Sequence, residues 1–165
     1  MIDKIWYKML DIKFGEIYLT KYLGLQKSLR KIFQIMILIV SSSGILGWKF
    51  FEKYAWVAFL LISIMQVFLL IKNQLVFSEK EMGQLAKLRM LYASYNNKLE
   101  KVWSEYYRRK TDEDEALSVF FDYREKDRAE ILSLQSKLDI RHVNWLIKQT
   151  NNEIEIYLRK YHNYE

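Results

Sequence analysis

Two charge-free stretches decide the expected fold: IFQIMILIVSSSGILGW at 32–48 and YAWVAFLLISIMQVFLLI at 54–71. They contain 17 and 18 residues, so as helices each would cover roughly 25–27 Å. That length approaches the hydrocarbon thickness of a bilayer, about 30 Å. The stretches predict a transmembrane hairpin over residues 32–72 whose tip is the segment 49–53.

The distribution of basic residues predicts the orientation of this hairpin. The flank 1–31 carries seven Lys or Arg residues, whereas the tip carries only Lys49 and Lys53. Positively charged flanks stay on the cytoplasmic side of a membrane. We therefore expect a bacterial inner-membrane protein with both termini in the cytoplasm.

The rest of the chain is expected to be helical. It contains no proline and only five glycines, so little in it terminates a helix. We expect an all-α protein: one or more amphipathic helices over 1–31, the hairpin over 32–72 and a helical bundle over 73–165. The second span should continue without a break to about Lys110, and new helices should start near 111–115 and Asp139. The helix after 115 is expected to bury a set of large apolar residues: Leu117, Phe120, Phe121, Leu132 and Leu138.

Polar residues within the two spans allow two interpretations. Gln34 and Ser41 share one helical face, and Ser63 and Gln66 share another. Such residues can hydrogen-bond neighbouring helices together. They can also line a weakly polar pore, which would need several copies of the hairpin around an axis.

Composition gives little support for catalysis. The chain has no cysteine and only two histidines, His142 and His162. It also lacks a glycine-rich phosphate loop. We predict no catalytic residue, no metal site and no cofactor, and therefore a protein that is not an enzyme.

A basic cluster suggests an anionic ligand. Arg108, Arg109 and Lys110 are consecutive, Arg124 follows on the next expected helix, and aromatic residues lie among these cations. Cations bind phosphates and aromatic rings stack on bases, so the pattern predicts a nucleotide or a single-stranded oligonucleotide. The alternative is an ordinary solvated face on which nearby acidic residues pair with the cations. The acidic residues are Glu105, Asp122, Glu125 and Asp127.

The order of these parts resembles the SLATT domain proteins, two-span helical effectors of prokaryotic conflict systems. A helical flank (1–31) leads into a tight hairpin (32–71), then a long helix (72–110) and further helices (113–163). The resemblance covers essentially the whole chain but is one of layout, without a short signature. Within that family the small stand-alone form is similar to the membrane effector of Hailong-type anti-phage systems.

The resemblance implies a homo-oligomeric pore, with a tetramer favoured, that permeabilises or depolarises the membrane during phage infection and leads to abortive infection. It also implies a nucleotide or oligonucleotide regulator made by a partner nucleotidyltransferase. The leading hypothesis is thus a ligand-gated channel effector, lined by Gln34, Ser41, Ser63 and Gln66. The alternative is a non-conducting membrane anchor or adaptor that recruits a partner through its helical domain.

Overall fold

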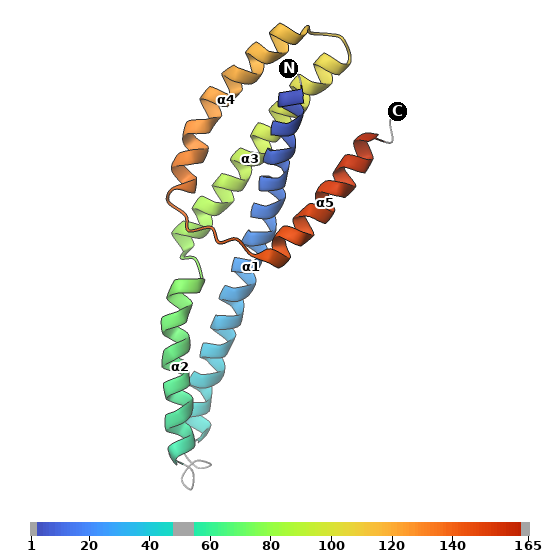
Figure 1. Ribbon diagram of the computed structural model, residues 1–165. Coiled ribbons are helices and arrows are strands. Elements are labelled where there is room, and N and C mark those ends of the chain that lie inside the picture. Colours follow the sequence, from blue (N-terminus) through green and yellow to red (C-terminus); the bar gives the residue numbers. More distant parts are fainter. Residues whose placement is uncertain (1–2, 48–54, 163–165) are drawn as a thin grey trace. The chain divides into compact units, whose positions relative to one another are not determined.

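The chain is a series of α-helices. The computed structural model describes residues 3–47 and 55–162, and the side chains within them except those of 40–47, 55, 58, 59, 61, 73, 161 and 162. These residues form five helices (Figure 1). The helices are α1 (Asp3–Gly47), α2 (Ala55–Leu75), α3 (Glu79–Tyr107), α4 (Glu113–Gln135) and α5 (Asn144–His162).

The helices divide into two compact units. Unit 1 combines residues 1–23 with 83–165, and unit 2 is formed by 24–82. The N-terminal half of α1 therefore belongs to the same unit as most of α3, α4 and α5, although 59 residues separate the two segments in the sequence. The sequence-based boundaries, at 31/32 and 72/73, do not mark this division.

The prediction of a two-span membrane hairpin is wrong. In the part of the chain that the structure describes, no helix combines the length and the apolar character that crossing a bilayer requires. Such a helix needs about 20 predominantly apolar residues. Polar residues limit both runs: Gln34 follows closely after Lys31 in α1, and α2 ends in Lys72, Asn73 and Gln74 before Leu75.

Three further predictions depended on those spans. An inner-membrane location, the placement of both termini in the cytoplasm and the description as a transmembrane channel are overturned by the same finding. The role in antiviral defence stays a prediction. The predicted pore-lining residues Gln34, Ser63 and Gln66 are exposed on unit 2, and the side chain of Ser41 lies outside the described residues. Large apolar side chains are also exposed on this unit, among them Leu38, Ile39, Trp56, Val67 and Leu70.

The predicted continuous helix from the second apolar run to Lys110 is also wrong, because α2 ends at Leu75 and α3 begins at Glu79. Ser78 and Glu81 form a reciprocal capping box. The Ser78 backbone N–H donates to Glu81 Oε2 at 2.8 Å, and the Glu81 N–H donates to Ser78 Oγ at 3.3 Å. The Ser78 hydroxyl also donates to Glu81 Oε2 at 2.6 Å, and this bond, together with the one from the Ser78 N–H, lowers the pKa of the Glu81 carboxyl. The capping box gives α3 a start of its own.

A buried glutamine on α1 stabilises the connection between α2 and α3. Gln26 is only 2% exposed. Its Oε1 accepts a hydrogen bond from the Phe77 N–H at 3.0 Å, and its Nε2 donates to the Leu75 carbonyl at 3.3 Å. Nearby, Arg30 on α1 pairs with Glu79 at 2.5 Å. The Gln26 side chain thus forms hydrogen bonds with two backbone groups, the Leu75 carbonyl and the Phe77 N–H, at the break between the helices, where such groups lack helical partners.

Replacing Gln26 by leucine should lower the free energy of unfolding by about 1–3 kcal/mol, because buried backbone groups lose the side chain that bonds them. The matched control is Gln34→Leu on the same helix, which should change that free energy by less than about 0.5 kcal/mol because Gln34 is exposed. Urea unfolding followed by circular dichroism measures both. Equal losses in the two variants would contradict this role for Gln26.

Unit 1 is held together by a core that draws on all four of its helices. The most deeply buried residues include Ile5 and Met9 on α1, Leu88 on α3, Phe120 on α4 and Leu146 on α5. The α4 helix begins where an acidic capping residue was expected: the Asp112 carboxylate accepts a hydrogen bond from the Glu115 N–H at 2.8 Å. The helix expected to follow Asp139 begins later, at Asn144.

Tyrosines on α1 fix the segment that leads into α5. The Tyr18 hydroxyl donates to the Arg141 carbonyl at 2.5 Å and accepts from the Val143 N–H at 3.1 Å. Lys21, also on α1, pairs with Glu153 on α5 at 2.5 Å. The part of α1 that lines a cavity with α3 and α4, residues 3–12, precedes these contacts along the helix.

Candidate ligand pocket

A cavity of about 780 Å³ lies within unit 1 between α1, α3 and α4. This volume falls in the range of small-molecule sites, about 300–1,000 Å³. Four cations line it together with two carboxylates, Asp3 and Asp11, so its lining carries a net positive charge. The cations are Lys4, Lys8, Arg124 and Arg128.

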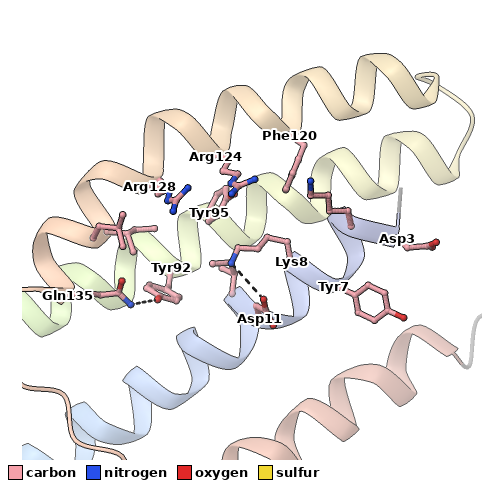
Figure 2. Close-up of a pocket in the computed structure, with 14 residues that line it drawn as sticks. Asp3, Tyr7, Lys8, Asp11, Tyr92, Tyr95, Phe120, Arg124, Arg128 and Gln135 are labelled. Atoms are coloured by element: carbon pink, nitrogen blue, oxygen red, sulfur yellow. Dashed lines mark hydrogen bonds and ion pairs between the residues drawn. The ribbon is translucent and has the colours of Figure 1, made fainter. Parts of the chain in front are cut away.

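Helical spacing explains how these cations converge. Lys4 and Lys8 are one turn apart on α1, and Arg124 and Arg128 are one turn apart on α4. Figure 2 shows Lys8 and the two arginines extending into the space between their helices, whereas Asp3 points away from it. Lys8 lies 3.7 Å from Asp11, a long ion pair between exposed groups that contributes little. The arrangement brings positive charge to the cavity from two of its helices, α1 and α4.

The acidic residues near the α4 arginines pair with lysines instead. Asp122 pairs with Lys126 at 2.7 Å and Asp127 with Lys98 at 2.8 Å. Among the described residues, neither Arg124 nor Arg128 has a carboxylate within 4.0 Å. The two guanidinium groups are therefore available to an anion, which the solvated-face interpretation did not anticipate.

Aromatic side chains form the apolar wall of the cavity. Tyr92 and Tyr95 come from α3, one helical turn apart, and Phe120 comes from α4. Tyr95 is 3% exposed and Phe120 1% exposed. Tyr7 also lines the cavity, but its side chain is 67% exposed and turns away in Figure 2. The cavity thus presents aromatic rings and cations together.

Tyr92, which is half-buried, and Tyr95, which is buried, differ in their hydroxyl groups. The Tyr92 hydroxyl accepts a hydrogen bond from Gln135 Nε2 at 2.7 Å, which is drawn in Figure 2. The Tyr95 hydroxyl is buried and has no hydrogen-bond partner among the described residues. Burial raises the pKa of both phenols, and Arg124 partly offsets this effect at Tyr95. Both groups are therefore neutral near pH 7 and can donate a proton to an acceptor.

The residues predicted to bind a ligand do not form one site. Arg124 lines the cavity, whereas Arg108, Arg109 and Lys110 are exposed at the end of α3. Arg109, with φ of 54°, and Lys110 line a separate hollow that shares no residue with the cavity. Asp112 and Glu115 balance their charge there, so this hollow attracts anions less than the cavity does.

Sequence reasoning missed most of the cavity's cations and aromatic residues. Lys4, Lys8, Tyr92 and Tyr95 were not assigned to a ligand site, because nothing in the sequence pairs α1 with α3 and α4. One pattern in the sequence could have indicated these residues. Pairs of like side chains one helical turn apart occur in three segments expected to be helical: Lys4 and Lys8, Tyr92 and Tyr95, and Arg124 and Arg128. In the described part of the chain, no group of three or more His, Asp or Glu side chains could hold a metal ion.

Comparison with known proteins finds no matching family model, no matching curated protein and no matching solved structure. The resemblance to the SLATT domain proteins therefore stays a prediction. The case for function depends on the chemistry of the cavity.

Proposed function

We propose that unit 1 is a binding module for a nucleotide, held in the cavity between α1, α3 and α4. The observation that carries the proposal is a pair of arginines, Arg124 and Arg128, that have no carboxylate partner among the described residues and line the cavity together with aromatic rings. A guanidinium group forms strong paired hydrogen bonds with phosphate oxygens. Aromatic rings supply a surface on which a base can stack.

The size and charge of the cavity support a nucleotide over other anions. Inorganic phosphate would leave most of the roughly 780 Å³ and the aromatic wall unused. An uncharged aromatic ligand would leave Arg124 and Arg128, which have no carboxylate within 4.0 Å among the described residues, without an anion. A nucleotide carries a flat ring and a phosphate chain on one molecule, and thus uses both the aromatic rings and the cations of the cavity.

Charge reversal tests the site. Arg124→Glu combined with Arg128→Glu should weaken binding of nucleoside 5′-triphosphates at least tenfold, because charge-assisted hydrogen bonds contribute about 1.5–3 kcal/mol each. Titration calorimetry at several salt concentrations measures this effect. In the unmodified chain, affinity should fall as salt rises, and the slope should be smaller in the variant.

Two control variants locate the effect. Lys148→Glu changes the charge by the same sign at an exposed position of α5 and should leave affinity within about twofold. Arg109→Glu with Lys110→Glu tests the separate hollow at the end of α3 and should also have little effect. The proposal fails if no nucleotide binds the unmodified chain, or if binding is independent of salt and survives reversal of Arg124 and Arg128.

A further inference from the structure

A second hollow, of about 460 Å³, lies on the surface of α4 beside the cavity. Three of the side chains that line it, Arg124, Arg128 and Leu132, also line the cavity. The two spaces therefore meet along these three side chains. The two arginines without carboxylate partners thus lie at the border between two spaces, and an anion bound to them can extend into either.

Helical geometry explains this border. The three shared side chains follow one another at intervals of four residues, so they form one ridge along the surface of α4. The adjacent row, formed by Phe121, Glu125 and Ala129, lies on the side of the hollow. The row on the other side of the ridge contains Ile131 and Gln135 and lies on the side of the cavity. A phosphate chain held by the arginines of the ridge has open space on both of its sides.

The exposed ring of Phe121 gives the hollow a surface on which a base can stack. The side chain is 44% exposed, so a flat ligand can reach it from solvent. Its ring touches that of Phe120, a residue of the cavity wall, at a centroid distance of 5.2 Å, so the aromatic surface continues from the cavity to the hollow. The Lys4 ammonium, 5.2 Å from the Phe121 centroid, adds positive charge beside the ring. Glu125 also lines the hollow, where the two arginines outweigh its charge.

We propose that the ligand is a dinucleoside polyphosphate whose phosphate chain lies on Arg124 and Arg128, with one nucleoside in the cavity and the second stacked on Phe121 in the hollow. This inference rests on the proposed function and names the class of nucleotide. Two guanidinium groups one helical turn apart can each hold a separate phosphate, which suits a chain of several phosphates. A nucleoside triphosphate would occupy the cavity and the arginines but leave the ring of Phe121 unused.

The test compares diadenosine triphosphate with adenosine triphosphate by titration calorimetry of the full chain. Both probes carry three phosphates, and they differ in the second nucleoside. The dinucleoside should bind at least about fivefold more tightly, although it carries less negative charge, because one base stacked on an aromatic ring contributes at least that factor. Phe121→Ala should remove this preference and leave the affinity for adenosine triphosphate within about twofold.

Two further variants locate the effect. Ala129→Leu fills part of the hollow at an exposed position of α4, and both residues are good helix formers. It should therefore weaken binding of the dinucleoside and leave that of adenosine triphosphate unchanged. Trp145→Ala is the matched control, because Trp145 is an aromatic residue with 51% exposure that lies on α5, away from both spaces. It should change neither affinity.

Each outcome decides a separate point. A preference for the dinucleoside that both Phe121→Ala and Ala129→Leu abolish, while adenosine triphosphate still binds, supports the second subsite. Equal or weaker binding of the dinucleoside to the unmodified chain overturns the subsite and leaves the proposed function standing. A preference that persists in both variants, or that Trp145→Ala also abolishes, overturns it as well. If the unmodified chain binds neither probe, the proposed function fails and this inference fails with it.

Discussion

Replacing Phe120 by alanine should lower the free energy of unfolding by about 3–5 kcal/mol, the usual cost of removing a buried phenylalanine. Phe120 is 1% exposed and is one of the largest fully buried side chains among the described residues. It lies on α4, where it also closes the aromatic wall of the cavity. Truncation removes apolar contacts and leaves a void that the surrounding helices can fill only in part. Urea unfolding of the full chain, followed by circular dichroism, measures the loss.

The adjacent phenylalanine provides the control. Phe121 is 44% exposed. It touches the ring of Phe120 edge-on at a centroid distance of 5.2 Å, and the Lys4 ammonium lies 5.2 Å from its centroid. Phe121→Ala should therefore cost about 1 kcal/mol or less. Similar losses in the two variants would contradict the described orientation of α4.

This pair of residues illustrates how far sequence reasoning reaches. The apolar periodicity after position 115 predicted a helix with a buried face. The structure has this helix, α4, with Phe120 buried on it and Leu138 buried just after its end. The same pattern placed Phe121 and Leu132 inside, whereas they are 44% and 49% exposed. Which side of a helix faces the core depends on the partner helices, and α4 contacts both α3, through Asp127 and Lys98, and the distant N-terminal half of α1, through Phe121 and Lys4.

The break between α2 and α3 was missed for a different reason. Ser78 and Glu81 have the spacing of a capping box, so the local signal was present in the sequence. A run of apolar residues at helical steps on both sides favoured one continuous helix. The decisive contact is the buried Gln26, whose distance from Phe77 in the sequence hides its role. The capping box at Ser78 and the distant side chain of Gln26 together end one helix and start the next, although the apolar periodicity continues across the break.

The candidate site was only partly predictable for the same physical reason. The chemistry, cations with aromatic rings, was recognised from composition, and one of the four predicted residues, Arg124, lines the cavity. Of the other three, Arg109 and Lys110 line a hollow where carboxylates balance them, and Arg108 is exposed. Proximity in sequence favoured Arg108, Arg109 and Lys110, but an electrostatic site depends on which charges remain unpaired after folding.

Replacing Gly15 by alanine should lower the free energy of unfolding by about 1–3 kcal/mol, although alanine is the better helix former. A Cβ atom at Gly15 would lie 2.2 Å from Tyr92 Cε1 and 2.7 Å from Cδ1, closer than carbon atoms can approach. The Tyr92 ring must then move, which disturbs its hydrogen bond with Gln135. Gly15 therefore permits the close approach of α1 and α3 that forms one side of the cavity. Thermal unfolding measures the loss, and nucleotide affinity should fall with it because Tyr92 lines the cavity.

Gly83→Ala is the control within the same unit. Gly83 lies on α3, and a Cβ atom there meets nothing within 4 Å. Only helix propensity changes at this position, so the variant should gain about 0.5–1 kcal/mol. The expected changes in stability have opposite signs because the substitution acts differently at the two positions. At Gly83 alanine only reduces the conformational freedom of the unfolded chain. At Gly15 the absence of a Cβ atom is what lets α1 and α3 approach each other. A gain of stability in Gly15→Ala would show that α1 and α3 do not approach as closely as described, and the wall that Tyr92 and Tyr95 form beside them would have to be reassigned.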